Sequence, residues 1–294
     1  MPATSRKRNK GKERKAKRQA KKEEKERADA NRLWRSGCRS NTGCNHGFDV
    51  DVVISDDHPV STFMDQYHIN FQYKRMPVSQ NLREIFKSHR YIWNNESYRK
   101  LAIDILVCIG TNLLLDRKQI DMSWPVCIAH SIVALEHYNG TDDIDLVLNK
   151  RKVISKWRDL VPSISSGRRD ALKFFRKRAS CSCLKEIHLE ARKNEHKKGW
   201  CYCCKVIKER AHLFVCSRCM VLQYCSRECQ LADWPEHKSS CDSYVRAHQN
   251  ESENTNQAAA ADGTVGGVPL ETLLDAFDYM STLTLPIDGD FGKT

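Results

Sequence analysis

Long hydrophobic runs are missing from this sequence of 294 residues, whose mean hydropathy is −0.62. No stretch approaches the roughly 20 apolar residues that a membrane-spanning helix needs. The N-terminus is charged and lacks the apolar segment of a secretory signal peptide. The chain also lacks a P-loop, a dinucleotide-binding glycine fingerprint and a His-Glu-x-x-His motif. These absences predict an intracellular protein that has no membrane span and that does not use the chemistry of those motifs.

Cysteine, in contrast, is abundant, with 14 residues in the chain. Disulfides are rare in a reducing compartment, so regularly spaced cysteines in an intracellular protein indicate metal binding. Seven cysteines and one histidine form four closely spaced pairs, which are Cys201-x2-Cys204, Cys216-x2-Cys219, Cys225-x3-Cys229 and His237-x3-Cys241. Eight such ligands are enough for two structural zinc ions, each with four protein ligands and no open position.

The spacing of the pairs also predicts local structure. Two cysteines separated by two residues sit on a tight turn, or knuckle, that brings both sulfurs to one ion. Ligands separated by three residues lie one helical turn apart and leave the same face of a helix. We therefore expect two knuckles followed by two short helices. Spacing alone does not show which pairs share an ion.

Residues between the ligands make the pattern more specific. Tyr224, Gln230 and Trp234 stand at fixed places in the run from Tyr224 to Cys241. With the two preceding knuckles, residues 201–241 resemble a MYND-type zinc finger. The resemblance implies a cross-braced module, in which Cys201, Cys204, Cys225 and Cys229 hold one zinc and Cys216, Cys219, His237 and Cys241 hold the other. Sequential pairing, the first pair with the second and the third with the fourth, also fits the spacing.

The resemblance implies a function as well. MYND fingers usually dock short proline-containing peptides of other proteins, often in transcriptional regulation. It therefore predicts a protein–protein interaction adaptor, with exposed peptide-binding candidates Gln223, Gln230 and Trp234 and residues 226–228 beside them. Trp234 has an alternative role as a core residue packed between the two metal sites.

The second hypothesis is a lysine methyltransferase, because some MYND fingers are inserted in SET domains of such enzymes. The chain lacks the Asn-His-Ser-Cys run that would mark the cofactor site of such an enzyme. Ions that already have four protein ligands cannot activate water or polarise a substrate. We therefore predict that the protein is not an enzyme.

Positive charge is concentrated at the N-terminus. Residues 6–27 contain thirteen Lys or Arg against four Glu, in a chain whose formal net charge is +12. A segment with so few apolar residues cannot bury enough surface to fold alone. We predict a basic disordered or helical tail over 1–35, acting as a non-specific nucleic-acid-binding or nuclear-import arm or as a solubilising tail. The import reading slightly favours a nuclear over a cytoplasmic location.

The remaining chain predicts a mainly α-helical fold with disordered tails at both ends. Residues 36–76 show no clear periodicity and are expected to be irregular. Residues 77–190 form a small α-helical domain of four or five amphipathic helices, which begin near Ser79, Asn95, Ser123, Thr141 and Ser165. The finger follows at 200–241. Residues 242–294 are a flexible tail with a short amphipathic helix near 269–281.

Two further sets of potential ligands lie outside the finger. Cys38, Cys44 and His46 fall in a glycine-rich stretch, and Cys181-x-Cys183 precedes His188. Neither set has a complete tetrahedral ligand set at a recognised spacing. The sequence therefore predicts two structural zinc ions and no third.

Overall fold

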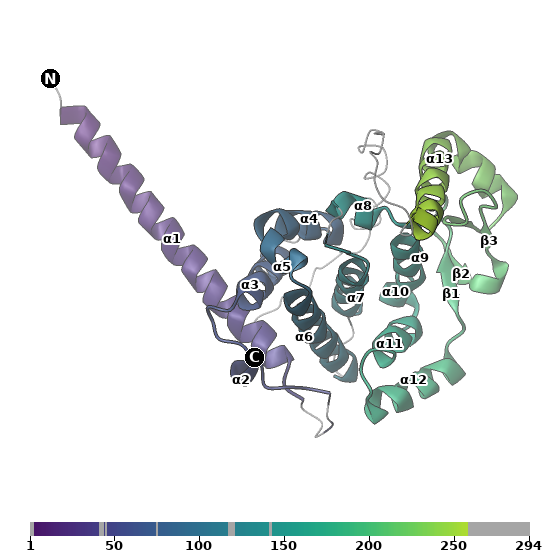
Figure 1. Ribbon diagram of the computed structural model, residues 1–294, viewed down its shortest axis with the longest axis horizontal. Coiled ribbons are helices and arrows are strands. Elements are labelled where there is room, and N and C mark those ends of the chain that lie inside the picture. Colours follow the sequence, from purple (N-terminus) through teal and green to yellow (C-terminus); the bar gives the residue numbers. More distant parts are fainter. Residues whose placement is uncertain are drawn as a thin grey trace.

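The computed structural model describes residues 3–40, 44, 46–74, 76–116, 121–140 and 143–257. Helices dominate this part of the chain, and its four short strands all lie close to the finger (Figure 1). The predicted mainly α-helical class is therefore confirmed. Among the described residues, no helix is both long and apolar enough to cross a bilayer.

The N-terminal helix α1 (Ala3–Gly37) extends from the body of the protein as a long rod (Figure 1). Its side chains are exposed from Gly11 to Lys25, but Ala30 and Trp34 are fully buried. The Trp34 ring nitrogen donates a hydrogen bond to Asp65, at 2.7 Å. The basic tail is thus a helix whose last turns belong to the core.

The segment expected to be irregular contains two helices, α2 (Val50–Val53) and α3 (Pro59–Gln72). In α3, Val60, Phe63, Met64 and Tyr67 are buried, at the spacing of one helical face. His58 caps the helix by accepting a hydrogen bond from the backbone N–H of Val60. The expectation of an irregular 36–76 is wrong here, because the apolar stripe is interrupted by polar residues that are also buried.

The helical domain continues with nine helices in the described chain. They are α4 (Val78–Ser88), α5 (Arg90–Asn94), α6 (Glu96–Leu115), α7 (Ser123–Glu136), α8 (Ile144–Leu148), α9 (Arg151–Leu160), α10 (Ser163–Ser166), α11 (Arg169–Arg176) and α12 (Ser182–Asn194). Asn95 caps α6 as predicted, since its side chain accepts from the backbone N–H of Tyr98 at 3.1 Å. Each of the last two predicted helices is instead a pair, α8 with α9 and α11 with α12. The helical conformation is interrupted at Asn149–Lys150 and at 177–181.

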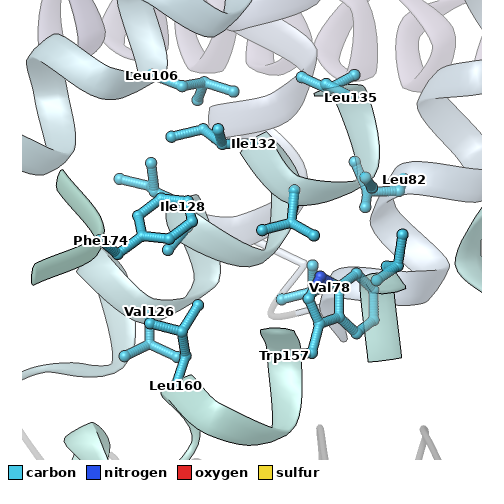
Figure 2. Packing of buried hydrophobic residues seen from close by; sticks show 14 of the residues in the cluster. Val78, Leu82, Leu106, Val126, Ile128, Ile132, Leu135, Trp157, Leu160 and Phe174 are labelled. Carbon is cyan, nitrogen blue, oxygen red and sulfur yellow. The ribbon is translucent and has the colours of Figure 1, made fainter. Parts of the chain in front are cut away.

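Helix α7 lies at the centre of the core. Its residues Val126, Ile128, Ile132 and Leu135 pack among side chains of α4, α6, α9 and α11 (Figure 2). Helix α6 approaches α11 closely at Gly110, where an added Cβ would lie 2.2 Å from the Phe175 ring. A larger residue at this position would require the Phe175 ring or one of the two helices to shift.

The finger consists of two short hairpins and one long helix. Strand β1 (Lys198–Trp200) pairs antiparallel with β2 (Ile207–Glu209), and β3 (Phe214–Val215) pairs with β4 (Gln223–Tyr224). A 3-10 turn, η1 (Arg210–His212), lies between the hairpins, and α13 (Arg227–Gln257) follows them.

Helix α13 corrects two expectations. The two predicted short helices are one, because the seven residues between Cys229 and His237 are also helical, despite Pro235. This helix begins at Arg227, so the expectation that Cys225 lies on it with Cys229 is wrong. The helix continues to Gln257, past the end predicted for the finger at Cys241. The helix predicted near 269–281 lies outside the described residues.

The buried His68 predicts how the helical domain responds to acid. It stacks on Trp124, and burial lowers the pKa of its imidazole to about 4. The unfolded chain therefore binds this proton below about pH 6.5, while the folded protein does not. The free energy of unfolding falls as the pH drops from 6.5 to 4. We expect His68→Phe to reduce the loss of stability between about pH 7 and pH 5 by about 2 kcal/mol.

Denaturant unfolding of both proteins at the two pH values measures this difference. His212→Phe is the matched control, because that imidazole is exposed on η1. The same pH dependence in His68→Phe as in the wild type would contradict the assignment.

Candidate metal centres

The first ligand cluster joins the first knuckle to the start of α13. Its members are Cys201, Cys204, Cys225 and Cys229, whose sulfurs all lie within 4.8 Å of one another. The sulfur of Cys225 is 3.5 Å from those of Cys204 and Cys229. Cys201 is buried, whereas Cys204 is exposed, so this cluster lies at the edge of the finger.

The second cluster joins the second knuckle to the middle of α13. Its members are Cys216, Cys219, His237 and Cys241, all of them buried, with ligand atoms within 4.8 Å of one another. The sulfurs of Cys216 and Cys241 are 3.9 Å apart, and Nε2 of His237 lies 3.7 Å from the sulfur of Cys219. The clusters thus alternate along the sequence. This is the cross-braced arrangement that the resemblance implied, and the sequential alternative is wrong.

Both clusters fit zinc by donor chemistry and by distance. A tetrahedral ion with Zn–S bonds near 2.3 Å holds its sulfurs about 3.8 Å apart, close to the separations observed. Thiolates and imidazole are the donors that favour zinc over magnesium or calcium. Burial lowers the pKa of His237, which favours the neutral imidazole that binds metal. The residues of the finger therefore form zinc-finger ligand sites.

The two knuckles have the same backbone conformation. Lys205 and Met220, each directly after the second cysteine of its knuckle, have φ angles of 61° and 57°. Their N–H groups donate to the carbonyls of Cys201 and Cys216, at 3.0 and 2.8 Å. A positive φ is unfavourable for residues other than glycine, so tertiary structure must hold these turns in place.

A buried hydrogen bond links the hairpins to α13 between the clusters. The Tyr224 hydroxyl donates to the Asp233 carboxylate at 2.7 Å, and Tyr224 is fully buried. Burial, together with this carboxylate, raises the pKa of Tyr224 well above its usual value. The phenol therefore stays protonated and remains the donor.

The three peptide-binding candidates lie in different environments. Gln223 is only 2% exposed, so the expectation that it is exposed is wrong. It belongs to β4, where its side chain packs behind the first hairpin, close to Gly199. Gln230 and Trp234 are partly exposed on α13. The Trp234 ring also meets His237 edge-on, at 5.8 Å between centroids, so it combines core packing with an accessible surface.

Helix α9 joins the finger to the helical domain. The buried Arg158 guanidinium donates to the backbone carbonyl of Val221, between the second knuckle and β4. The next residue, Asp159, accepts from Arg210 of η1 at 2.5 Å. No sequence motif marks these residues, because arginines and aspartates in a charged helix look the same whether they face solvent or another domain.

The structure also brings together the two ligand sets that we expected not to bind metal. Cys44, His46, Cys181 and Cys183 form a third group with ligand atoms within 4.8 Å of one another. Cys38 and His188 are not part of it. The expectation that neither set finds a complete ligand set is therefore wrong, because each supplies two ligands and their separation in sequence concealed the match.

Comparison with known proteins agrees with the geometry of the finger. A family model described as the MYND finger matches residues 201–241. The chain is 50% identical over 40 residues to the "SET domain-containing protein 14" of Caenorhabditis elegans, a match covering 14% of this chain and 9% of that protein. It is 38% identical over 48 residues to the "SET domain and MYND-type zinc finger protein 6" of Schizosaccharomyces pombe, covering 16% and 10% respectively.

These matches concern the finger and not the rest of the chain. The similarity spans only about a tenth of each relative's length and lies over the MYND region. No solved structure matches the chain.

Tyr224→Phe tests the hydrogen bond at the centre of the finger. The substitution removes the hydroxyl donor, so the buried Asp233 carboxylate loses this hydrogen bond. We expect the free energy of unfolding to fall by about 1–3 kcal/mol, while zinc content is unchanged. Denaturant unfolding at constant free zinc measures the effect. Tyr73→Phe, at an exposed tyrosine, is the control, and an equally small change in both variants would contradict the role of Tyr224.

Proposed function

Since residues 201–241 form a MYND finger, we propose that the protein is an adaptor whose finger docks short proline-containing peptides of partner proteins. The supporting observation is an exposed apolar and amide-bearing face on α13, held by two ligand clusters that leave no room for a substrate on the metal. Two zinc ions with four protein ligands each would be structural. The adaptor role accordingly rests on the surface of the finger.

The docking face is formed by Gln230, Leu231 and Trp234. Trp234 is four positions after Gln230 and three after Leu231, so its side chain lies beside both of them near the start of α13. Leu231 is 62% exposed, and Trp234 presents part of its ring. No other described residue need move for a peptide to reach Leu231.

The chemistry of this face suits a proline-containing segment. Such segments adopt an extended polyproline helix, which has no internal hydrogen bonds and loses little entropy on binding. Proline rings pack against apolar and aromatic side chains such as Leu231 and Trp234. The Gln230 amide can donate to a peptide carbonyl, which is accessible in that conformation.

Methyltransferase activity is not part of the proposal. The SET domains appear in the names of relatives whose similarity to this chain covers only the finger. A MYND finger is itself a non-catalytic interaction module.

Leu231→Glu tests the docking face. It places a charge where the proposal requires an apolar contact, and it lies on an exposed position, so the finger should fold and keep its zinc. On an array of proline-containing peptides, we expect the peptides retained by the wild type to bind at least roughly tenfold more weakly, a change typical of a contact worth about 1.4 kcal/mol.

Leu146→Glu is the matched control, because Leu146 is a similarly exposed leucine on α8. Equal binding by wild type and Leu231→Glu would contradict the docking face. If the wild-type protein binds no peptide on the array, the adaptor proposal is contradicted.

The helix α1 supports a second candidate function, non-specific nucleic-acid binding. Its basic side chains from Lys12 to Lys25 are exposed, and the rod projects clear of the helical domain (Figure 1). A nucleic acid could therefore contact it without steric conflict with the body of the protein. Phosphate contacts of this kind carry no sequence information and weaken steeply with salt.

Neutralising Lys15, Arg18 and Lys25 by substitution with Gln tests this function. For a random-sequence DNA duplex, we expect weaker binding and a salt dependence whose logarithmic slope is smaller by roughly one per lost phosphate contact. The control neutralises Lys185, Arg192 and Lys193, which are exposed on α12. An unchanged slope in the α1 variant, or wild-type binding insensitive to salt, would contradict the function.

A further inference from the structure

The structure points to a third zinc site, outside the finger, formed by Cys44, His46, Cys181 and Cys183. Two of these ligands follow α1, and the other two are at the start of α12. Each offers one ligand atom, and the four atoms lie within 4.8 Å of one another. The set has three sulfurs and one imidazole nitrogen, the same composition as the second finger cluster.

The distances inside this group match those of the finger. The sulfurs of Cys44 and Cys181 are 3.3 Å apart, and Nδ1 of His46 is 3.5 Å from the sulfur of Cys181. In the finger, the corresponding separations run from 3.5 to 3.9 Å. The finger thus serves as an internal reference, because its ligand sets belong to a known zinc-binding family.

His46 is oriented to present one nitrogen to the group. Its Nε2 atom lies 3.1 Å from the Ser40 hydroxyl, while its Nδ1 atom faces Cys181. Metal-binding histidines usually use the second nitrogen in this way, in a hydrogen bond that fixes the tautomer and the ring. His46 is 8% exposed, so a metal would be sheltered on this side.

The backbone holds the His46 loop firmly against the helical domain. The N–H of Phe48 donates to the Cys38 carbonyl at 3.0 Å, and Asn112 of α6 donates to the Gly37 carbonyl at 2.8 Å. At Gly47, an added Cβ would lie 2.4 Å from the backbone nitrogen of Ser40. Glycine is therefore required at the close approach that places His46 beside α12.

The other two ligands occupy the first turn of α12. Cys181 is its N-cap residue, and Cys183 follows within the same turn. The unpaired N–H groups and the dipole at a helix N-terminus stabilise thiolates, the form that binds zinc. This position adds to the geometry of the four ligands and does not replace it.

A disulfide is the competing explanation for the two closest sulfurs. The 3.3 Å between Cys44 and Cys181 exceeds the roughly 2.05 Å of an S–S bond. A disulfide would also leave His46 and Cys183 without a role in the cluster. Zinc accounts for all four residues, and its preference for sulfur and nitrogen donors in a tetrahedron matches this set.

The site would act as a staple between distant parts of the chain. Cys44 and Cys181 are 137 positions apart, so zinc would tie the base of the basic helix α1 to the helix that leads into the finger. Metal binding between such distant ligands contributes to folding, because the unfolded chain has no preformed site.

Elemental analysis of the full-length protein, purified with a phosphine reductant, tests the proposal. We expect three equivalents of zinc in the wild type and two in Cys181→Ser/Cys183→Ser. Cys127→Ala, which removes a cysteine outside the three groups, should keep three. Two equivalents of zinc in the wild type would overturn the third site. Fewer than two equivalents would instead contradict the binding of two ions by the finger.

Cadmium NMR of the wild type gives a result that does not depend on folding of a variant. We expect three metal resonances, one from a site with four sulfurs and two from sites with three sulfurs and one nitrogen. Only one resonance of the mixed type would overturn the proposal. A Cys44–Cys181 disulfide found by mass spectrometry in the reduced preparation would do so as well.

Discussion

Alternation of the two ligand sets is the constraint on which the finger depends. The first set takes Cys201 and Cys204 from a knuckle, Cys225 from the bend before α13 and Cys229 from α13 itself. The second set takes two residues from a knuckle and two from α13, so neither set is complete until both the hairpins and the helix are in place. The hairpins alone cannot supply that order, since their strands have only two or three residues each. Two residues with positive φ, Lys205 after the first knuckle and Met220 after the second, add strain that the rest of the finger must offset. Zinc bound by these two sets would contribute folding free energy directly, as expected for a segment too short to support a large core.

The finger is also part of a larger core. Buried finger residues such as Leu213, Val221 and Tyr224 belong to the same hydrophobic cluster as the helical domain. Arg158 adds a directed contact, because its buried guanidinium satisfies the Val221 carbonyl next to the second knuckle. Leaving that buried charge without its partner would cost more than losing an exposed ion pair. The orientation of the finger relative to the helical bundle is thus set by α9, and the two parts of the protein should respond together when either is destabilised.

Sequence alone was most informative where ligands are close together. The eight finger ligands could be found because metal chemistry requires particular residues at short, regular spacings, and the cap at Asn95 could be found because capping acts within three residues. It failed where tertiary contacts determine which residues are buried and which distant residues meet. Helix α3 was missed because Asp65, His68 and Asn70 are buried although polar, which blurs its apolar stripe. Gln223 was expected to be exposed because nothing in a two-residue strand shows which side faces the other hairpin. The group of Cys44, His46, Cys181 and Cys183 was missed because its halves meet only through the packing of α1, α6 and α12.

The three ligand groups have a common position in the fold, at junctions between elements that are separated in the sequence. The finger groups join hairpins to α13, and the third joins the loop after α1 to the start of α12. Since α12 leads directly into β1, a zinc staple at its N-terminus would fix both ends of the connection between the helical domain and the finger. The basic rod and the docking face on α13 would then be held by one rigid framework, α1 to α12 to the finger. A partner peptide and a polyanion bound at these two places would therefore be kept at a defined separation, which a flexible linker could not achieve.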